Sequence, residues 1–191
     1  MLKVALVGNI ASGKSTVEKA LQTSGYVVLD TDKVCHELLT CDEVSKEFST
    51  FDVFENGIIS REKLGKLVFA NVELKKRLED ILYPMVRLRI AEFFEQYNAE
   101  SLVFVAIPLL FEAGMVDLFD KIVFVYCDDD IRLKRLTARN NYTEEYAKIR
   151  MGAQQSQDEK IKKSDYVIYN NSTIEALDRC VDSVVNELLN L

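Results

Sequence analysis

One stretch near the N-terminus constrains this chain more than any other. Residues 8–16 read Gly-Asn-Ile-Ala-Ser-Gly-Lys-Ser-Thr, which matches the pattern G-x-x-x-x-G-K-S. An apolar run, residues 4–7, precedes the pattern, and residues 17–21 after it have helical character. A strand, a tight loop and a helix in this order are the context in which the pattern binds the phosphates of a nucleotide. The sequence therefore predicts a site for a nucleoside triphosphate.

The residues of this phosphate loop have separate roles. Gly8 and Gly13 let the backbone turn where a side chain would obstruct it. Successive N–H groups then point at a phosphate, and the helix N-terminus adds positive potential. Lys14 reaches the outer phosphates, and the hydroxyl of Ser15 can ligate Mg²⁺. The nucleotide-binding residues that we expect here are Gly8, Ala11, Ser12, Gly13, Lys14, Ser15 and Thr16.

Composition limits the class of protein and its partners. A chain of 191 residues with 48% hydrophobic composition can form one core with small inserted lobes. Its net charge of −7 argues against nucleic acid, because binding to a phosphate backbone requires a basic face. No apolar run is long enough to cross a membrane, and four cysteines without a C-x-x-C pair indicate reduced thiols. We expect a cytoplasmic protein, as a monomer or a weak homo-oligomer.

The pattern of apolar residues predicts an α/β fold. Residues 2–7 and 26–29 are typical of buried strands, and residues 15–23 between them of a helix, which together make a unit of two parallel strands and a crossover helix. Ligands of such sheets bind at the carboxyl ends of the strands. Further strands are expected at 102–107, 121–127 and 166–169, with helices at 130–140, 144–155, 158–163 and 173–189.

The stretch from residue 33 to residue 97 contains little strand and is too long for a connection. Helical spacing occurs at 33–39, 42–51, 61–69, 72–82 and 85–97, with Ser60 as an N-cap and Tyr83-Pro84 as the end of the fourth helix. We interpret this stretch as a substrate-binding lobe. The expected organisation is a single domain with a nucleotide-binding core (1–32, 98–127 and 164–191), the lobe (33–97) and a lid (128–163).

Two acids, Asp30 and Asp32, directly follow the second strand. Phosphoryl transfer to a hydroxyl needs Mg²⁺ on the β- and γ-phosphates and an acceptor for the hydroxyl proton. Asp30, nearer the sheet, suits the metal or its water shell, and Asp32 suits the acceptor hydroxyl. The alternative is that Asp32 only caps a helix that begins at Lys33.

A basic cluster lies in the predicted lid. Arg135 and Arg139 are four residues apart and share a helix face, with Arg132 on the same side. Arginines on a lid that closes over a triphosphate neutralise the charge that develops during transfer. The alternative is a solvated basic face, but in an acidic chain this local excess favours a function.

Two other groups of polar residues are interpreted as structural. The acids at 128–130 follow a predicted strand, but Asp130 suits an N-cap of the next helix better than a magnesium ligand. His36, with Cys35 and Cys41, lacks the second pair of ligands that zinc would need. We therefore expect His36, Cys35 and Cys41 to pack within the lobe. Asp30 is expected to be a better metal contact than the acids at 128–130.

Several motifs in order resemble the dephospho-CoA kinase family along essentially the whole chain. Besides the generic phosphate loop, they are Asp30-Thr31-Asp32 with His36-Glu37-Leu38, Tyr83-Pro84-Met85-Val86, Pro108-Leu109-Leu110-Phe111-Glu112, Arg135 with Arg139, Gln154 with Lys160, and Ser164-Asp165-Tyr166-Val167-Ile168 before Asn170. The Asp-x-Asp with His-Glu-Leu and the Pro-Leu-Leu-Phe-Glu segment are the most particular to that family.

The resemblance implies a P-loop kinase fold with a five-stranded parallel sheet, a helical CoA-binding lobe and a lid. It implies transfer of the γ-phosphate of ATP, with Mg²⁺, to the ribose 3′-hydroxyl of dephospho-CoA, the last step of coenzyme A synthesis. Lys14 would then neutralise the transferred phosphate, Asp32 would be the general base, and Arg139 would contact ATP and the transition state. The alternatives are a P-loop kinase of another nucleoside or small alcohol, and a regulatory nucleotide-binding switch.

The chain departs from the family pattern at a few positions. Asn9 and Ala11 replace glycines of the phosphate loop, and Ala11 is the more awkward replacement if the backbone there needs a positive φ. Tyr83 replaces a histidine, Asn140 an aspartate and Tyr169 an aspartate. None of these changes removes Lys14, Ser15, Asp30, Asp32 or Arg139 from the sequence.

Overall fold

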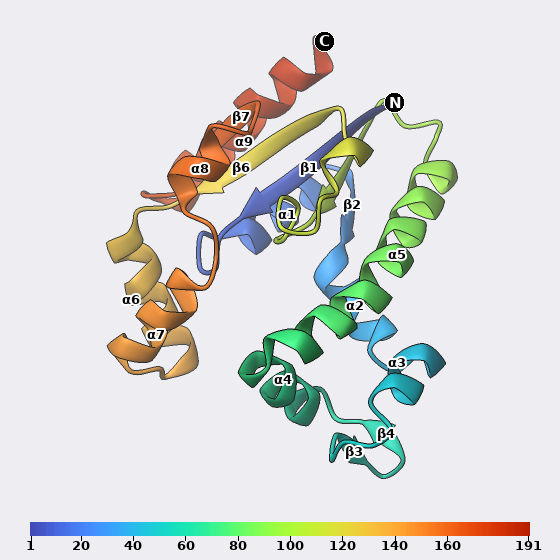
Figure 1. Ribbon diagram of the computed structural model, residues 1–191. Helices are drawn as coiled ribbons and strands as arrows, with labels where there is room; N and C mark the ends of the chain where they lie inside the picture. The colour runs from blue at the N-terminus through green and yellow to red at the C-terminus, as the bar shows by residue number, and fades with distance from the viewer. The chain divides into compact units, whose positions relative to one another are not determined.

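The computed structural model describes all 191 residues and divides them into two compact units. The first unit contains Met1–Leu29 and Phe94–Leu191, and the second contains Asp30–Phe93. Figure 1 gives the elements of both in chain order. No helix is long and apolar enough to cross a lipid bilayer.

A five-stranded sheet is the centre of the first unit. Its strands lie in the order β2 (Val27–Asp30), β5 (Leu102–Ala106), β1 (Leu2–Gly8), β6 (Lys121–Tyr126) and β7 (Tyr166–Tyr169). The pairs of β1 with β5, β1 with β6 and β6 with β7 are parallel. Figure 1 shows β1 and β6 side by side in the middle of this sheet. The expected α/β fold with a five-stranded parallel sheet is confirmed.

The core of this unit follows from the apolar strands. Residues 4–7 of β1 and 103–106 of β5 are almost completely buried, as an inner strand covered on both faces must be. The helices α1 (Lys14–Thr23) and α9 (Ile174–Leu189) contribute one apolar stripe each to the same cluster, with Val17, Leu21, Leu177 and Val181 packed on Val4, Leu6 and Phe104. The burial of β1 on both sides fixes the position of the loop that leaves its carboxyl end.

Three helices follow β6: α6 (Asp129–Asn140), α7 (Glu144–Gly152) and α8 (Gln157–Ile161); a short 3₁₀ helix, η1 (Val116–Leu118), precedes β6. Helix α6 begins one residue earlier than expected, and its N-cap residue is Asp128. The prediction that Asp130 caps this helix is therefore wrong. The reason is that Asp129 is held in the first turn by Arg132 and Gln157. The left-handed residue Asn141 ends α6, and Thr143 caps α7 by accepting a bond from the backbone of Tyr146.

The second unit consists of α2 (Thr31–Leu38), α3 (Asp42–Glu47), α4 (Arg61–Ala70) and most of α5 (Val72–Gln96), which continues into the first unit. It also contains an antiparallel hairpin of β3 (Phe54–Glu55) and β4 (Ile58–Ile59), which lies between the expected helices 42–51 and 61–69. Asn56 and Gly57 between these strands both have positive φ, at 52° and 80°, the conformation that a tight hairpin turn requires. Ser60 stands at the N-cap position of α4 as expected, without a side-chain capping bond.

Pro84 lies inside α5, so the prediction of two helices separated at Tyr83-Pro84 is wrong. Proline lacks an N–H, and inside a helix its ring costs about 3 kcal/mol. The helix nevertheless continues, because the residues on both sides of the proline present one buried apolar stripe. Its members are Leu74, Leu78, Leu82, Val86 and Ile90. Tertiary packing outweighs the local preference here.

Candidate active site

The phosphate loop has the geometry that its sequence predicts. It runs from the end of β1 at Gly8 to the start of α1 at Lys14. Within it, the amide of Ser12 donates to the carbonyl of Asn9 at 3.0 Å, and the amide of Thr16 donates to Gly13 at 2.9 Å. This tight turn places the first amides of α1 beside the loop, where the helix dipole favours an anion.

Gly13 cannot be replaced in this loop for two reasons. Its φ is +93°, which disfavours any residue with a Cβ. A Cβ added there would also lie 2.0 Å from Nδ2 of Asn170, which follows β7. That Nδ2 atom is not displaceable at low cost, because it donates to the carbonyl of Ser12 at 2.7 Å.

Ala11 occupies the left-handed region, with φ of 62°. The loop therefore needs a positive φ at this position, which is the condition under which alanine is an unfavourable replacement for glycine. A left-handed conformation costs an L-residue with a Cβ about 1–2 kcal/mol. Asn9, the other substituted glycine, has no positive φ and is accommodated without this cost.

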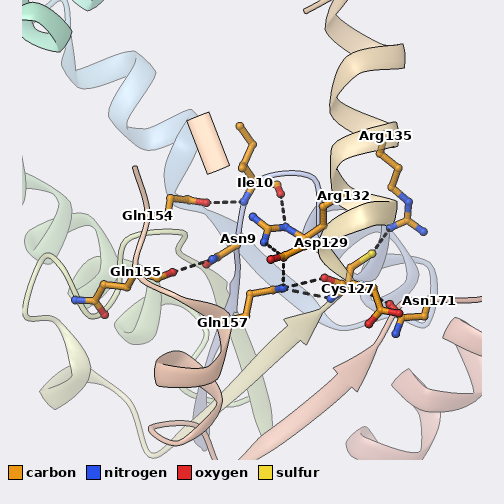
Figure 2. A network of polar contacts seen from close by, with 11 residues as sticks. Asn9, Ile10, Cys127, Asp129, Arg132, Arg135, Gln154, Gln155, Gln157 and Asn171 are labelled. Atoms are coloured by element: carbon orange, nitrogen blue, oxygen red, sulfur yellow. Dashed lines mark hydrogen bonds and ion pairs between the residues drawn. The ribbon is translucent and has the colours of Figure 1, made fainter. Parts of the chain in front are cut away.

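Side chains from distant segments hold the backbone of the loop at Ile10, and the side chain of Asn9 binds the backbone of a distant segment (Figure 2). Arg132 Nε donates to the carbonyl of Ile10 at 3.0 Å, and the amide of Ile10 donates to Oε1 of Gln154 at 2.7 Å. Nδ2 of Asn9 donates to the carbonyl of Gln155 at 2.9 Å. Sequence reasoning placed Gln154 in a family motif but did not predict this contact, since 144 residues separate it from Ile10.

Arg135 holds the other side of the loop. Its Nη1 atom donates to the carbonyl of Ser12 at 3.4 Å and lies at the same distance from Sγ of Cys127. Its Nη2 atom donates to the carbonyl of Asn170 at 3.2 Å. Burial raises the pKa of the Cys127 thiol, while the guanidinium groups of Arg135 and Arg132 oppose this shift. Arg135 thus joins α6, the phosphate loop and the end of β7.

The three arginines that share a face in the sequence have different surroundings. Arg132 is 2% exposed and forms an ion pair of 2.7 Å with Asp129, whereas Arg135 is half-buried against the loop. Arg139 is exposed, and its Nε atom donates to Oδ1 of Asn140 at 2.9 Å. A solvated basic face therefore describes Arg139 only.

Asp30, the last residue of β2, and Asp32 have distinct positions at the start of α2, in the second unit. Asp30 is the N-cap, because its Oδ1 atom accepts a bond of 3.0 Å from the amide of Asp32. The alternative that Asp32 caps this helix is wrong, since Asp32 lies in its first turn. Burial raises the pKa of the nearby Cys35 thiol to about 11, and the charges of Asp32 and Asp30 add to this shift. The negative charges of both carboxylates are therefore close enough to Cys35 to disfavour its thiolate form.

The oxygen donors Ser15 and Asp30 fit Mg²⁺, which keeps water and phosphate ligands, better than a metal ion that protein side chains alone would hold. No group of three or more His, Cys, Asp or Glu side chains that could hold a metal ion occurs in the chain. Mg²⁺ keeps several water ligands and needs only one or two protein oxygens beside the phosphates. Ser15 is exposed in the first turn of α1 and can supply a hydroxyl. One oxygen of Asp30 is used by the cap, and the other is 3.7 Å from Nζ of Lys33.

A buried ion pair joins two further motifs. Nζ of Lys160 in α8 lies 2.8 Å from Oε1 of Glu112, and the side chain of the lysine is completely buried. Glu112 follows β5 and ends the Pro-Leu-Leu-Phe-Glu segment. The pair ties α8, which follows the contacts at Gln154 and Gln155, to the loop after β5.

A glycine loop at the end of a central parallel strand, followed by a helix, is the arrangement of a P-loop nucleotide-binding protein. The family described as dephospho-CoA kinase matches residues 2–176. The chain belongs to this family.

Two further comparisons agree. A dephospho-CoA kinase of Geobacillus kaustophilus is 38% identical over 193 residues, which cover 97% of this chain and 96% of the relative. The crystal structure of TT1252 from Thermus thermophilus superimposes with a TM-score of 0.87 at 33% identity, covering 98% of this chain and 97% of that one. A dephospho-CoA kinase from Campylobacter jejuni superimposes with a TM-score of 0.76 at 31% identity, with the same coverage.

Proposed function

We propose that this chain transfers the γ-phosphoryl group of ATP to the ribose 3′-hydroxyl of dephospho-CoA, the final step of coenzyme A synthesis. The observation that carries the proposal is the phosphate loop of residues 8–16, in its binding geometry, within a chain of this family. The partners are thus ATP and dephospho-CoA, with no role for nucleic acid or a membrane. We place the protein in the cytoplasm.

The phosphates of ATP bind to the loop. The amides from Ala11 to Thr16 surround the β-phosphate, and the ammonium group of Lys14 neutralises charge on the transferred group. Gly8 and Gly13 leave room for this close approach. Contacts of the loop with Arg132, Gln154 and Asn170 fix its backbone, which favours a preorganised arrangement of the amides.

Asp32 acts as the general base. It takes the proton of the 3′-hydroxyl while the hydroxyl oxygen forms a bond to the γ-phosphorus and the bond from that phosphorus to the β–γ bridging oxygen breaks, so ADP leaves. Asp32 lies in the first turn of α2, directly after the N-cap residue Asp30, and this place beside the end of a strand of the sheet supports the role.

Mg²⁺ supplies charge neutralisation on the β- and γ-phosphates when it is bound. Ser15 and Asp30 are the residues that would hold it, Ser15 through its hydroxyl and Asp30 through a carboxylate oxygen or a water molecule. The fit of both residues to a water-rich magnesium shell supports this assignment.

Two arginines of α6, Arg135 and Arg139, have separate roles in binding ATP. Arg135 binds ATP beside the loop that it already contacts. Arg139 is exposed, and it contacts ATP and the transition state when the lid (128–163) closes. The lobe (33–97) binds the acceptor, and the compact unit Asp30–Phe93 supports its assignment as a separate lobe.

The test is phosphate transfer by the purified protein with ATP, Mg²⁺ and dephospho-CoA, with the product followed by mass spectrometry. We expect an acceptor that is heavier by one phosphoryl group, and no product with the variant Lys14→Ala even at saturating ATP. A panel of nucleosides and small alcohols serves as competing acceptors. Transfer to one of these but not to dephospho-CoA would overturn the proposal. Slow ATP hydrolysis without any acceptor would indicate a switch instead.

A further inference from the structure

Gln157, the first residue of α8, is a polar side chain that is only 7% exposed. Its Nε2 atom donates to the carbonyl of Cys127 and to Oδ1 of Asp129, both at 2.9 Å. Its Oε1 atom accepts from the amide of Cys127 at 3.4 Å. Both N–H donors of this side chain are therefore used, and the orientation of its amide group is fixed.

The helix that carries Gln157 is itself held at both ends. Ser156 caps α8 by accepting a bond of 3.2 Å from the amide of Glu159. Lys160 is completely buried and lies 2.8 Å from Oε1 of Glu112. Because Gln157 and Lys160 are three residues apart, they share one face of the helix. Gln157 is therefore presented by a fixed element.

The bond from Gln157 selects one conformation of an exposed carboxylate. The side chain of Asp129 is 71% exposed, and an exposed side chain can adopt several rotamers. Its Oδ1 atom accepts both from Gln157 and from Nη1 of Arg132, the latter at 2.7 Å. Gln157 thus favours the rotamer in which Asp129 meets Arg132. That partner matters, because the arginine side chain is only 3% exposed and a buried charge needs a counter-ion.

Arg132 in turn holds one peptide group of the phosphate loop. Its Nε atom donates to the carbonyl of Ile10 at 3.0 Å, and Figure 2 shows the whole series of contacts from Cys127 to Ile10. The carbonyl of Ile10 and the N–H of Ala11 belong to the same planar trans peptide, so they point in opposite directions. The bond from Arg132 therefore sets the direction of the Ala11 amide, one of those assigned above to the β-phosphate.

This peptide group needs support because Ala11 is in the left-handed region, with φ of 62°. A residue with a Cβ disfavours that conformation. Rotation of the peptide between Ile10 and Ala11 changes this φ and can relieve the strain. The same rotation turns the carbonyl of Ile10 away from Arg132 and the amide of Ala11 away from the phosphates. The bond from Arg132 opposes it.

We propose that Gln157 is a positioning residue for ATP, which acts through Asp129 and Arg132 to keep the amide of Ala11 directed at the phosphates. Gln157 itself contacts no substrate. The inference rests on the proposed function for the identity of the nucleotide, and it adds a residue outside the phosphate loop on which the affinity for ATP depends.

The first variant is Gln157→Met, which keeps an unbranched side chain but removes its donors and its acceptor. We expect the Kd of ATP, measured by calorimetry, and the KM for ATP to rise about tenfold, while kcat at saturating ATP and the KM for dephospho-CoA change less than about twofold. A residue that only stabilises the fold would lower the fraction of folded enzyme, and so reduce the apparent kcat without a change in Kd or KM. The control is Gln22→Met, the same exchange at an exposed position of α1, which should change none of these values.

A double-mutant cycle tests the route. If Gln157 acts through Asp129, then Gln157→Met should change the Kd of ATP less than about twofold when it is added to Asp129→Ala, because the contact that transmits its effect is already absent. Independent effects of the two changes would multiply instead. If Gln157→Met does not fold, Gln157→Glu at about pH 8 replaces it in both measurements, since the ionised carboxylate has the same shape, lacks both N–H donors and repels Asp129.

The inference is overturned if the variant at Gln157 binds ATP as tightly as the unaltered protein. It is also overturned if the Kd rises by the same factor with and without Asp129→Ala, since Gln157 then acts by another route. Both results come from binding measurements that need no acceptor. Absence of transfer to dephospho-CoA by the unaltered protein would instead contradict the proposed function, and the calorimetric comparison would still decide the role of Gln157.

Discussion

The side-chain amide of Asn170 donates a hydrogen bond of 2.7 Å to the carbonyl of Ser12, although 158 residues separate the two. This contact brings the end of β7 against the phosphate loop. It also fills the space beside Gly13 into which a side chain would point. The shape of the loop therefore depends on the last strand of the sheet as well as on its own glycines.

Gly13→Ala should abolish ATP binding and phosphate transfer. The new Cβ would meet Asn170 and would need a left-handed backbone, so the loop must change shape. Gly65→Ala is the control, because Gly65 lies inside α4 with nothing within 4 Å of an added Cβ. That variant should gain about 1 kcal/mol in the free energy of unfolding and keep its activity. Normal ATP affinity in Gly13→Ala, measured by calorimetry, would contradict the geometry described.

Ala11→Gly should stabilise the protein. It removes the cost of a left-handed alanine but adds freedom to the unfolded chain, so we expect a net gain of up to about 1 kcal/mol in the free energy of unfolding. Ala20→Gly, the same exchange inside α1, should instead lose about 1 kcal/mol. Urea unfolding of both variants measures the difference. A loss of stability in both would show that residue 11 is not strained.

Asp32→Asn should lower kcat by about 10²–10⁴-fold and leave ATP binding nearly unchanged, as expected when a general base is removed. The comparison with Asp30→Asn separates the roles of the two acids. Asparagine caps a helix as well as aspartate does, so α2 keeps its N-terminus and only the carboxylate charge is lost. That variant should need more Mg²⁺ for half-maximal rate. Full activity in Asp32→Asn would leave no chemical role for this residue.

Glu112→Gln should destabilise the protein by about 3–5 kcal/mol, because the completely buried ammonium group of Lys160 would lose its counter-ion. Replacing both partners, as Glu112→Leu with Lys160→Met, should recover much of this loss. The control is Glu144→Gln, which breaks the exposed pair with Lys148 and should leave the unfolding midpoint unchanged. Equal losses of stability in Glu112→Gln and Glu144→Gln would show that the buried pair contributes no more to the free energy of unfolding than the exposed pair.

The sequence was sufficient for the features that depend on local pattern. The buried runs at 2–7 and 102–107 predicted inner strands, and the spacing of the phosphate loop predicted its turn. Local reasoning failed at Pro84, because a buried apolar stripe continues through the proline and the helix continues with it. It also considered only Asp32 as a cap, whereas Asp30 is the cap, because α2 begins at Thr31 and not at Lys33.

The candidate site was predictable in its members but not in their contacts. Arg135 and Arg139 were expected to bind ATP, which stays a prediction, but the contacts of Arg132 with Ile10 and of Arg135 with Ser12 of the loop were not predicted. Gln154 and Asn170 were recognised only as motif residues. Their partners lie more than 140 residues away, and a single sequence carries no periodic signal for such pairs.

The order of the sheet has a consequence for synthesis on the ribosome. β1 is made first, yet it lies between β5 and β6, so its neighbours emerge only after residues 102 and 121. The nascent N-terminal segment, one of the most apolar in the chain, must wait for most of translation before it can pair. A growing chain released before β7 would lack the bond from Asn170 to Ser12, so the full set of contacts that hold the phosphate loop arises only near the end of translation.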